Sequence, residues 1–116
     1  MLFMEYPPCG TCKKARKWLE ENGVDFTARH IKEEQPTLSE LKEWHGKSGL
    51  PMKKFFNTSG KLYRELELKD KLPTMSDEAM LDLLATDGML VKRPIAVLKN
   101  KVLVGFKEAE WEEFLK

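Results

Sequence analysis

The chain has 116 residues, 41% of them hydrophobic, which is enough to bury the core of one domain without disulfide bonds. Twenty basic residues nearly balance nineteen acidic ones, so the formal net charge of +1 provides no long-range field to attract nucleic acid or anionic membranes. The sequence shows neither a secretory signal nor a membrane-spanning run, and we therefore expect a cytoplasmic protein.

The first third of the sequence predicts a β-α-β unit. Residues 2–6 form a short apolar and aromatic run that ends at Pro7-Pro8, as expected for a buried strand entering a loop. From Cys12 onward, apolar residues recur at helical spacing until Asn22-Gly23. Residues 24–30 then alternate apolar and polar side chains, which predicts a second strand.

The middle of the chain, about 36–88, is expected to be helical. Thr37 and Glu40 have the spacing of a capping box, and the helix they begin is expected to end at Gly46. A short apolar turn around residues 52–56 follows, and the sequence 57–60 then breaks the chain. Another helix is predicted with Ser76 as its N-cap, Met75 and Met80 as a hydrophobic staple, and Gly88 at its end.

The last part of the chain predicts a β-hairpin and a helix. Residues 95–98 and 102–104 are apolar runs separated by a turn at Asn100-Lys101. Trp111 and the apolar residues 114–115 then recur at helical spacing among glutamates. The predicted order is therefore β-α-β, a helical block, and β-β-α.

The candidate reactive site is the Cys9-x-x-Cys12 pair, which lies where the first strand passes into the first helix. Backbone N–H groups and the positive end of the helix dipole stabilise a thiolate at such a position. Because the thiolate is the reactive species, Cys9 is the expected nucleophile and Cys12 the resolving thiol. In a reducing compartment, such a pair indicates redox catalysis, redox sensing or metal binding before a structural disulfide.

Each candidate residue also has a simpler interpretation. A zinc site is disfavoured, because there is no second C-x-x-C and His30 and His45 lack the close spacing of zinc ligands. Arg93 precedes a proline at the start of a strand, so it either reaches the thiol site or is an ordinary surface arginine. The basic residues Lys13, Lys14 and Arg16 either lower the pKa of Cys9 or form the solvated face of the helix.

Three motifs resemble the ArsC/Spx family of arsenate-reductase-like proteins, and the resemblance extends over essentially the whole chain. The motifs are Pro8-Cys9-Gly10-Thr11-Cys12-Lys13-Lys14-Ala15, Phe55-Phe56-Asn57-Thr58 and Lys92-Arg93-Pro94-Ile95. The resemblance implies an α/β thioredoxin-like sandwich in a single domain, 1–116, with a core of about 1–35 and 89–116 and a helical insertion of about 36–88.

The resemblance also implies the chemistry of the site. It makes Cys9 the nucleophile, places Arg93 near it, makes Pro94 cis, and gives Gly10 and Thr11 a part in shaping the site. Neither a metal nor a prosthetic cofactor is expected. The reductant would be an external thiol such as thioredoxin, glutaredoxin or glutathione.

The sequence departs from the family pattern at several positions, and these departures allow us to rank three functional hypotheses. Glutaredoxin-dependent arsenate reductases use three arginines, whereas here only Arg93 is retained, the other positions falling near Asn57 and near Gly105-Phe106. Those enzymes commonly have serine at the position of Cys12. We therefore rank a thiol–disulfide oxidoreductase first and an Spx-like redox-sensing regulator that binds the RNA polymerase α-subunit second. A true arsenate reductase is third.

Two further differences qualify this ranking. The sequence ends after the final helix without the longer tail of the Spx regulators, and residues 49–60 differ from their polymerase-contacting region. Lys53, Lys54 or Arg64 are the candidates to compensate for the missing arginines in an arsenate reductase.

Overall fold

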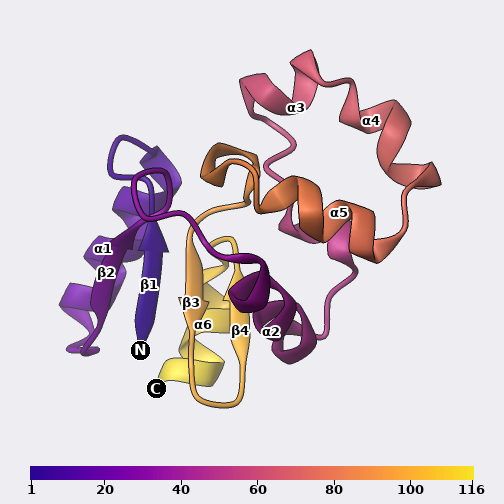
Figure 1. Ribbon diagram of the computed structural model, residues 1–116. Coiled ribbons are helices and arrows are strands. Elements are labelled where there is room, and N and C mark those ends of the chain that lie inside the picture. The colour runs from indigo at the N-terminus through magenta and orange to yellow at the C-terminus, as the bar shows by residue number, and fades with distance from the viewer.

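The computed structural model describes residues 1–116 and is organised around one four-stranded sheet (Figure 1). The strand order is β2-β1-β3-β4. Strand β1 (Leu2–Glu5) pairs in parallel with β2 (Thr27–His30) and antiparallel with β3 (Ile95–Val97), which in turn pairs antiparallel with β4 (Val102–Val104). The predicted β-α-β unit and hairpin are confirmed.

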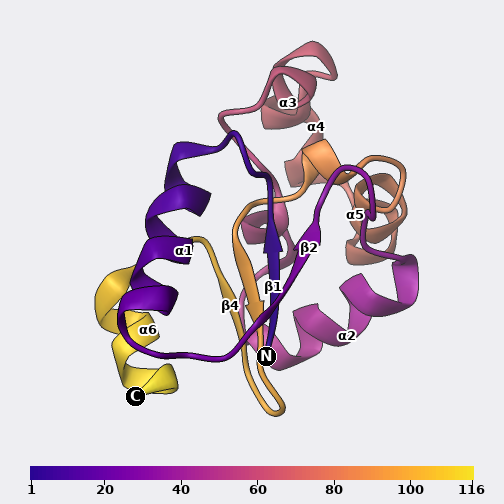
Figure 2. The same cartoon turned by 90° about the vertical axis from the view of Figure 1, so that its left-hand side faces the viewer.

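Helices cover both faces of the sheet. Helix α1 (Gly10–Glu21) and helix α6 (Glu108–Leu115) lie together on one face, and α2 (Leu38–Ser48) lies on the other (Figure 2). Side chains of consecutive strand residues point to opposite faces. Phe3 accordingly belongs to the apolar cluster under α1 and α6, whereas Met4 belongs to the larger cluster on the other side.

The segment between β2 and β3 contains most of the helices. Helix α2 is followed by several short elements, which are η1 (Met52–Phe55), α3 (Lys61–Glu65), α4 (Leu68–Lys71), η2 (Leu72–Thr74), α5 (Asp77–Leu84) and η3 (Gly88–Leu90). Helices α3 and α4 lie far from the sheet in both views (Figures 1 and 2). No helix has both the length and the apolar character that crossing a bilayer would require.

Helix α2 begins as predicted but ends later. The Thr37 hydroxyl accepts a hydrogen bond from the Glu40 N–H at 3.1 Å, and the Glu40 carboxylate accepts one from the Thr37 N–H at 3.0 Å, which completes the capping box. The predicted end at Gly46 is wrong. The helix continues to Ser48, and Gly49, with a φ of 69°, forms the left-handed C-cap.

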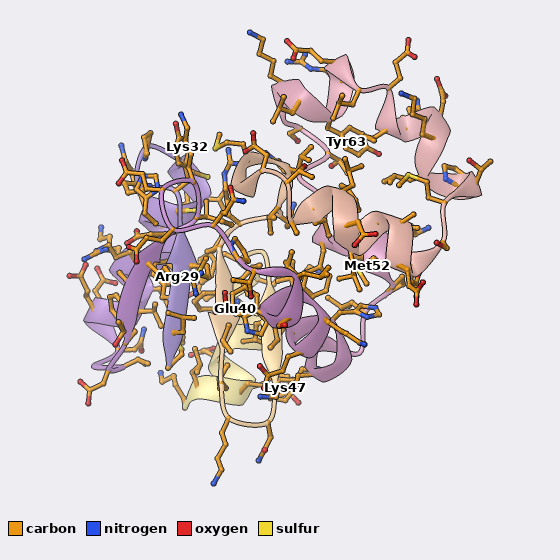
Figure 3. The ribbon with its side chains drawn as sticks, in the orientation of Figure 1. Arg29, Lys32, Glu40, Lys47, Met52 and Tyr63 are labelled. Carbon is orange, nitrogen blue, oxygen red and sulfur yellow. The ribbon has the colours of Figure 1, made fainter.

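Helix α2 is joined to β2 by an ion pair. The Arg29 guanidinium donates two hydrogen bonds to the Glu40 carboxylate, at 2.6 and 2.9 Å, and the two side chains meet between β2 and α2 (Figure 3). This contact holds the pKa of Glu40 below its usual value. Arg29 also donates to the carbonyls of Glu34 and Gln35, so one side chain fixes the connection between β2 and α2.

The predictions for the next helices are only partly right. Ser76 caps α5 as predicted, since its hydroxyl accepts from the Ala79 N–H at 3.1 Å. However, α5 ends at Leu84, and Gly88 instead begins η3. Helices α3 and α4 were not predicted, because helices of five and four residues are too short to show an apolar stripe.

Gly88 is required for a different reason from the one predicted. A Cβ atom at this position would lie 1.8 Å from the Ile31 carbonyl oxygen and 2.8 Å from its carbonyl carbon. Backbone atoms cannot move aside as a flexible side chain does. The glycine therefore allows η3 to approach the residue that follows β2.

We predict that Gly88→Ala lowers the free energy of unfolding by about 1–3 kcal/mol, because the added methyl group overpacks the contact with Ile31. Urea unfolding followed by tryptophan fluorescence measures this. Gly46→Ala is the matched control, since its Cβ meets nothing within 4 Å and it lies within α2. Replacing this helical glycine should stabilise the protein by about 0.5–1 kcal/mol. A Gly88→Ala protein as stable as the wild type would contradict the assignment.

Candidate thiol site

Cys9 is the N-cap residue of α1. Its φ and ψ are −73° and 126°, and its side chain does not cap the helix. Two backbone hydrogen bonds hold it at the junction with β1, one from the Cys9 N–H to the Tyr6 carbonyl at 2.8 Å and one from the Lys13 N–H to the Cys9 carbonyl at 3.0 Å. The first turn of α1 contains no acidic residue. The thiol therefore faces the positive end of a 12-residue helix without a competing carboxylate on that turn.

The pKa of Cys9 lies below its ordinary value. Partial burial alone would raise this pKa, but four hydrogen-bonding groups together outweigh burial. They are the backbone N–H and the side chain of Cys12, the side chain of Arg93, and the backbone N–H of Thr11. Each of these groups lies near the sulfur and favours its thiolate form.

Cys12 is shifted in the opposite direction. It is fully buried, and burial, followed by the hydrogen bond to Cys9 and the charge of Cys9, raises its pKa to about 12. A hydrogen bond from the Tyr6 N–H to the Cys12 sulfur, at 3.4 Å, acts against this rise. The pair therefore consists of a part-exposed thiol at Cys9, whose pKa is lowered, and a buried thiol at Cys12, whose pKa is raised.

Arg93 is held at this site by its neighbours. Its guanidinium carbon lies 4.8 Å from the centre of the Tyr6 ring, and its Nη1 atom lies 4.0 Å from the Met89 sulfur. The Arg93–Pro94 peptide bond is cis, and Pro94 is buried at the start of β3. Arg93 and Cys9 line the same cleft, which favours the interpretation in which Arg93 reaches the thiol site.

The thiol opens into a cleft of about 520 Å³. Cys9 and Thr11 contribute from the start of α1, and Lys92 and Arg93 from the segment before β3. The other walls are formed by residues 104–107, at the end of β4 and just after it, and by Asn57 and residues 59–61, which lead into and begin α3. Gly10 is exposed, with open space where a Cβ would lie.

The segment before α3 reaches the cleft because it is tied to the segment before β3. The Asn57 N–H donates to the Leu90 carbonyl at 2.8 Å, and the Lys92 N–H donates to the Phe55 carbonyl at 2.7 Å. Phe56 and Val91 form an antiparallel bridge between these two bonds. Pairing here places Asn57 and the residues after it beside Arg93.

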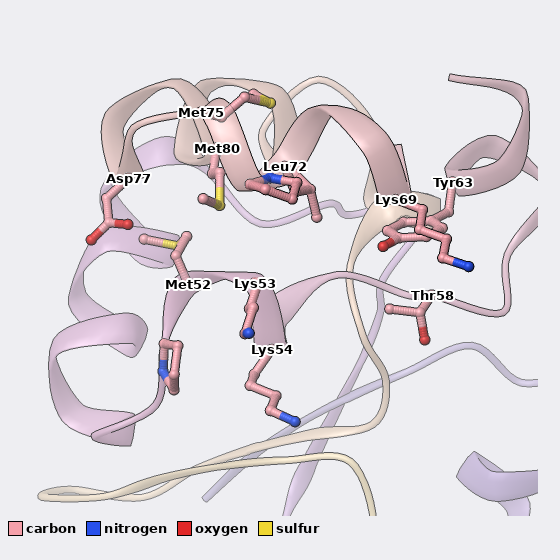
Figure 4. A pocket seen from close by; sticks show the side chains of 12 residues that line it. Met52, Lys53, Lys54, Thr58, Tyr63, Lys69, Leu72, Met75, Asp77 and Met80 are labelled. Atoms are coloured by element: carbon pink, nitrogen blue, oxygen red, sulfur yellow. The ribbon is translucent and has the colours of Figure 1, made fainter. Parts of the chain in front are cut away.

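The two positions aligned with missing arginines both lie in this cleft, since Asn57 and Gly105-Phe106 line it. The expected compensating cations do not. Lys53 and Lys54 line a separate cavity of about 490 Å³ between η1 and α5 (Figure 4), and Arg64 does not line the Cys9 cleft.

The cations that do line the cleft beside Arg93 are Lys61, Lys92 and Lys107, which sequence reasoning missed. Tyr6 was also missed. Its position before Pro7-Pro8 indicates a turn. Nothing in the sequence indicates that it contacts an arginine 87 positions later, and only the fold shows this contact.

The other basic residues near Cys9 have different partners. Arg16 forms an ion pair with the buried carboxylate of Glu5, and its guanidinium lies 5.5 Å from the centre of the Phe26 ring. Lys13 and Lys14 are exposed, which fits the solvated face of the helix. No group of three or more His, Cys, Asp or Glu side chains is arranged to hold a metal ion.

A mixed four-stranded sheet between two layers of helices, with a cysteine at the start of the first helix and a cis proline beside it, defines the thioredoxin-like class of fold. A crystal structure of an ArsC family related protein from Bacteroides fragilis superposes with a TM-score of 0.97 at 58% identity, over 99% of this chain and 96% of that one. The structure of an arsenate reductase from Vibrio cholerae superposes with a TM-score of 0.84 at 27% identity, over 99% of this chain and 98% of that one.

Sequence comparison gives the family directly. A model of the ArsC family matches residues 4–114. The chain is 57% identical to the uncharacterized protein YusI of Bacillus subtilis, over 97% of this chain and 96% of that protein. It is 33% identical to the global transcriptional regulator Spx 1 of Oceanobacillus iheyensis, over 94% of this chain and 82% of that protein. The chain belongs to the ArsC family.

We predict that Cys9 is alkylated at a lower pH than an ordinary thiol, because the rate follows the thiolate fraction and the pKa of Cys9 is lowered. Iodoacetamide rates against pH on Cys12→Ser report Cys9. The same measurement on Cys9→Ser reports Cys12, which should react slowly throughout because it is buried and its pKa is raised to about 12. A Cys9 that titrates like a free thiol would disprove the assignment.

Tyr6 offers a second test of the site, since its ring supports the guanidinium of Arg93. We predict that Tyr6→Leu raises the pKa of Cys9, because Arg93 loses the surface that keeps it beside the sulfur. Tyr6→Phe retains the ring and should leave this pKa near that of the wild type. Both variants keep the backbone hydrogen bond to Cys12, so ultraviolet absorbance of the thiolate against pH isolates the ring. Equal behaviour of the two variants would refute the role of Tyr6.

Proposed function

We propose that this protein is a thiol–disulfide oxidoreductase in which Cys9 is the nucleophile and Cys12 the resolving thiol. The observation that carries the proposal is the opposite shift of the two pKa values, lowered at Cys9 and raised at Cys12. Two thiols at one helix end thus differ in how readily they ionise. Membership of the ArsC family and the thioredoxin-like fold support a redox role.

The proposed reaction uses only the two thiols and an external reductant. The Cys9 thiolate attacks one sulfur of a substrate disulfide, the substrate S–S bond breaks, and one half leaves as a thiolate that takes a proton from solvent. Cys12 then loses its proton and attacks the Cys9 sulfur, which releases the second half. The two electrons come from the protein, which is left with a Cys9–Cys12 disulfide. Thioredoxin, glutaredoxin or glutathione restores both thiols in the cytoplasm.

The coupling between the cysteines suits this order of steps. The negative charge of Cys9 is one cause of the raised pKa of Cys12. That charge disappears when Cys9 enters a mixed disulfide. The pKa of Cys12 then falls, so the resolving thiol becomes easier to deprotonate at the stage when it must attack.

The neighbouring residues have roles that follow from their positions. Arg93 stabilises the Cys9 thiolate and the departing thiolate of the substrate. The exposed Gly10 and the N–H of Thr11 keep the sulfur open to substrate on one side and hydrogen-bonded on the other. Pro94 shapes the wall that carries Arg93.

We predict that Cys12→Ser traps mixed disulfides on Cys9, because the resolving sulfur is absent. Trapped species should be released by dithiothreitol and be missing from Cys9→Ser, which is the matched control. Mild oxidation of the wild type should give an intramolecular Cys9–Cys12 disulfide, measured by intact mass and peptide mapping. Stable sulfinic acid on Cys9, or dimers alone, would argue against a resolving role for Cys12.

The second candidate is an Spx-like redox-sensing regulator. The specific observation in its favour is the 33% identity to Spx 1 over 94% of this chain. In this function the Cys9–Cys12 pair would control binding to the RNA polymerase α-subunit. A pull-down with the C-terminal domain of that subunit, in the reduced and oxidised states, separates the regulator from the enzyme.

The third candidate is an arsenate reductase, favoured by the likeness to the enzyme from Vibrio cholerae. We predict that it reduces arsenate poorly, because Arg93 is the one arginine of the cleft and a lysine cannot grip a tetrahedral oxyanion with two parallel hydrogen bonds. The loss of two arginine contacts corresponds to roughly two to four decades in rate.

Arsenite formation with glutaredoxin or thioredoxin measures this rate. The Vibrio cholerae enzyme is the positive reference, and Cys9→Ser and Arg93→Ala are the negative controls. Efficient turnover that both substitutions abolish would move arsenate reductase to first place.

A further inference from the structure

The cleft at Cys9 concentrates positive charge in a chain whose net charge is only +1. Four cationic side chains line it, and no aspartate or glutamate does; the four are Lys61, Lys92, Arg93 and Lys107. They come from three separate segments of the chain, the start of α3, the residues before β3 and the residues after β4. The positive charge is therefore a product of the fold and not of local composition.

Most of this charge is not neutralised by the protein. Lys92, Arg93 and Lys107 form no ion pair with a carboxylate. Lys61 lies 3.6 Å from Glu65, but both side chains are exposed, and such surface pairs contribute little. The cleft thus presents unpaired cations around the Cys9 sulfur.

Lys92 is placed in the cleft by a glycine. A Cβ atom at Gly105 would lie 3.3 Å from the Lys92 side-chain carbon Cε, and Gly105 has a φ of 78°. The absence of a side chain at Gly105 lets the stem of Lys92 lie across the backbone after β4. One of the arginines of the family pattern is expected near Gly105-Phe106, so here a cation enters this part of the cleft from another segment.

The size of the cleft indicates what the cations bind. About 520 Å³ lies within the range of sites for organic ligands and far exceeds the space that one tetrahedral oxyanion fills. Thr11, Ser59 and Phe106 line it along with the cations. An extended molecule with negative charges at some distance from its reacting atom fits these walls better than a compact anion.

We infer that the substrate of Cys9 is a small disulfide that carries a carboxylate on each side of its S–S bond. This inference rests on the proposed function. Cys9 attacks one sulfur, one carboxylate-bearing thiol leaves, and Cys12 displaces the second. One substrate disulfide is reduced to two thiols while Cys9 and Cys12 are oxidised to one disulfide. Lys61, Lys92 and Lys107 hold the carboxylates.

Three small disulfides that differ in charge test this inference. They are 3,3′-dithiodipropionate, a dianion, bis(2-hydroxyethyl) disulfide, which is neutral, and cystamine, a dication. Pre-reduced protein is mixed with each at pH 7 and low salt, and the Cys9–Cys12 disulfide is quantified by acid quench and mass spectrometry. Each rate constant is divided by that of a small neutral thiol, which removes the intrinsic reactivity of the probe.

We expect the dianion to react at least about tenfold faster than the neutral probe and the dication to react slowest. Charged clefts alter association rates by about 10–1000-fold. The preference should shrink in high salt, where the Debye length falls to about 3 Å at 1 M. A triple variant, Lys61→Gln, Lys92→Gln and Lys107→Gln, should bring the ratio of dianion to neutral rates close to one. Using a ratio cancels any change in the reactivity of Cys9.

The second cavity supplies a matched control. Lys53, Lys54 and Lys69 line it together with three methionines (Figure 4), and none of the three lysines lines the Cys9 cleft. Changing all three to glutamine removes the same net charge and should leave the ratio as in the wild type.

The inference is overturned if all three probes are reduced at rates that do not depend on their charge. It is also overturned if both triple variants lose the preference for the dianion equally. Either result leaves the proposed function standing. Failure of every probe to oxidise Cys9 overturns the proposed function and the inference with it.

Discussion

Two hydrogen bonds at the junction of β1 and α1 constrain the rest of the site. The Cys9 N–H donates to the Tyr6 carbonyl at 2.8 Å, and the Tyr6 N–H donates to the Cys12 sulfur at 3.4 Å. Together they fix the end of the strand against the first turn of the helix, so both sulfurs have defined positions. The ring of the same Tyr6 supports Arg93. A single residue thus contacts Cys9, Cys12 and Arg93.

The sheet makes this junction rigid because both of its faces are covered. Phe3 and Ala96 pack with Trp111 on the side of α1 and α6, while Met4 and Ile95 face the other helices. Strand β1 lies in the middle of the sheet, between β2 and β3. Cys9 therefore follows a central strand, and the segment before α3 reaches the thiol through backbone pairing with the segment before β3. Rigid support on both sides suits a site that must keep two sulfurs in register.

The same fold separates two groups of lysines that the sequence does not distinguish. Lys53 and Lys54 precede the break at residues 57–60, and Lys61 follows it, yet the first two line one cavity and the third lines the Cys9 cleft. Because of this distribution, the Cys9 cleft is positively charged although the chain as a whole is nearly neutral. A protein of net charge +1 can in this way have a positively charged cleft without a long-range field that attracts polyanions in general.

The sequence by itself determined the features that depend on near neighbours. The Cys9-x-x-Cys12 pair at a strand-to-helix junction, the Thr37 capping box, the Ser76 cap and the C-terminal hairpin all follow from contacts within a few residues, which leave a pattern in the sequence. Only the tertiary structure decided which distant residues meet. Tyr6 lies against Arg93, Gly88 lies against Ile31, and Lys61 and Lys107 flank one cleft because of the path of the chain through space. Such contacts form between segments with no sequence periodicity in common, so no local pattern records them.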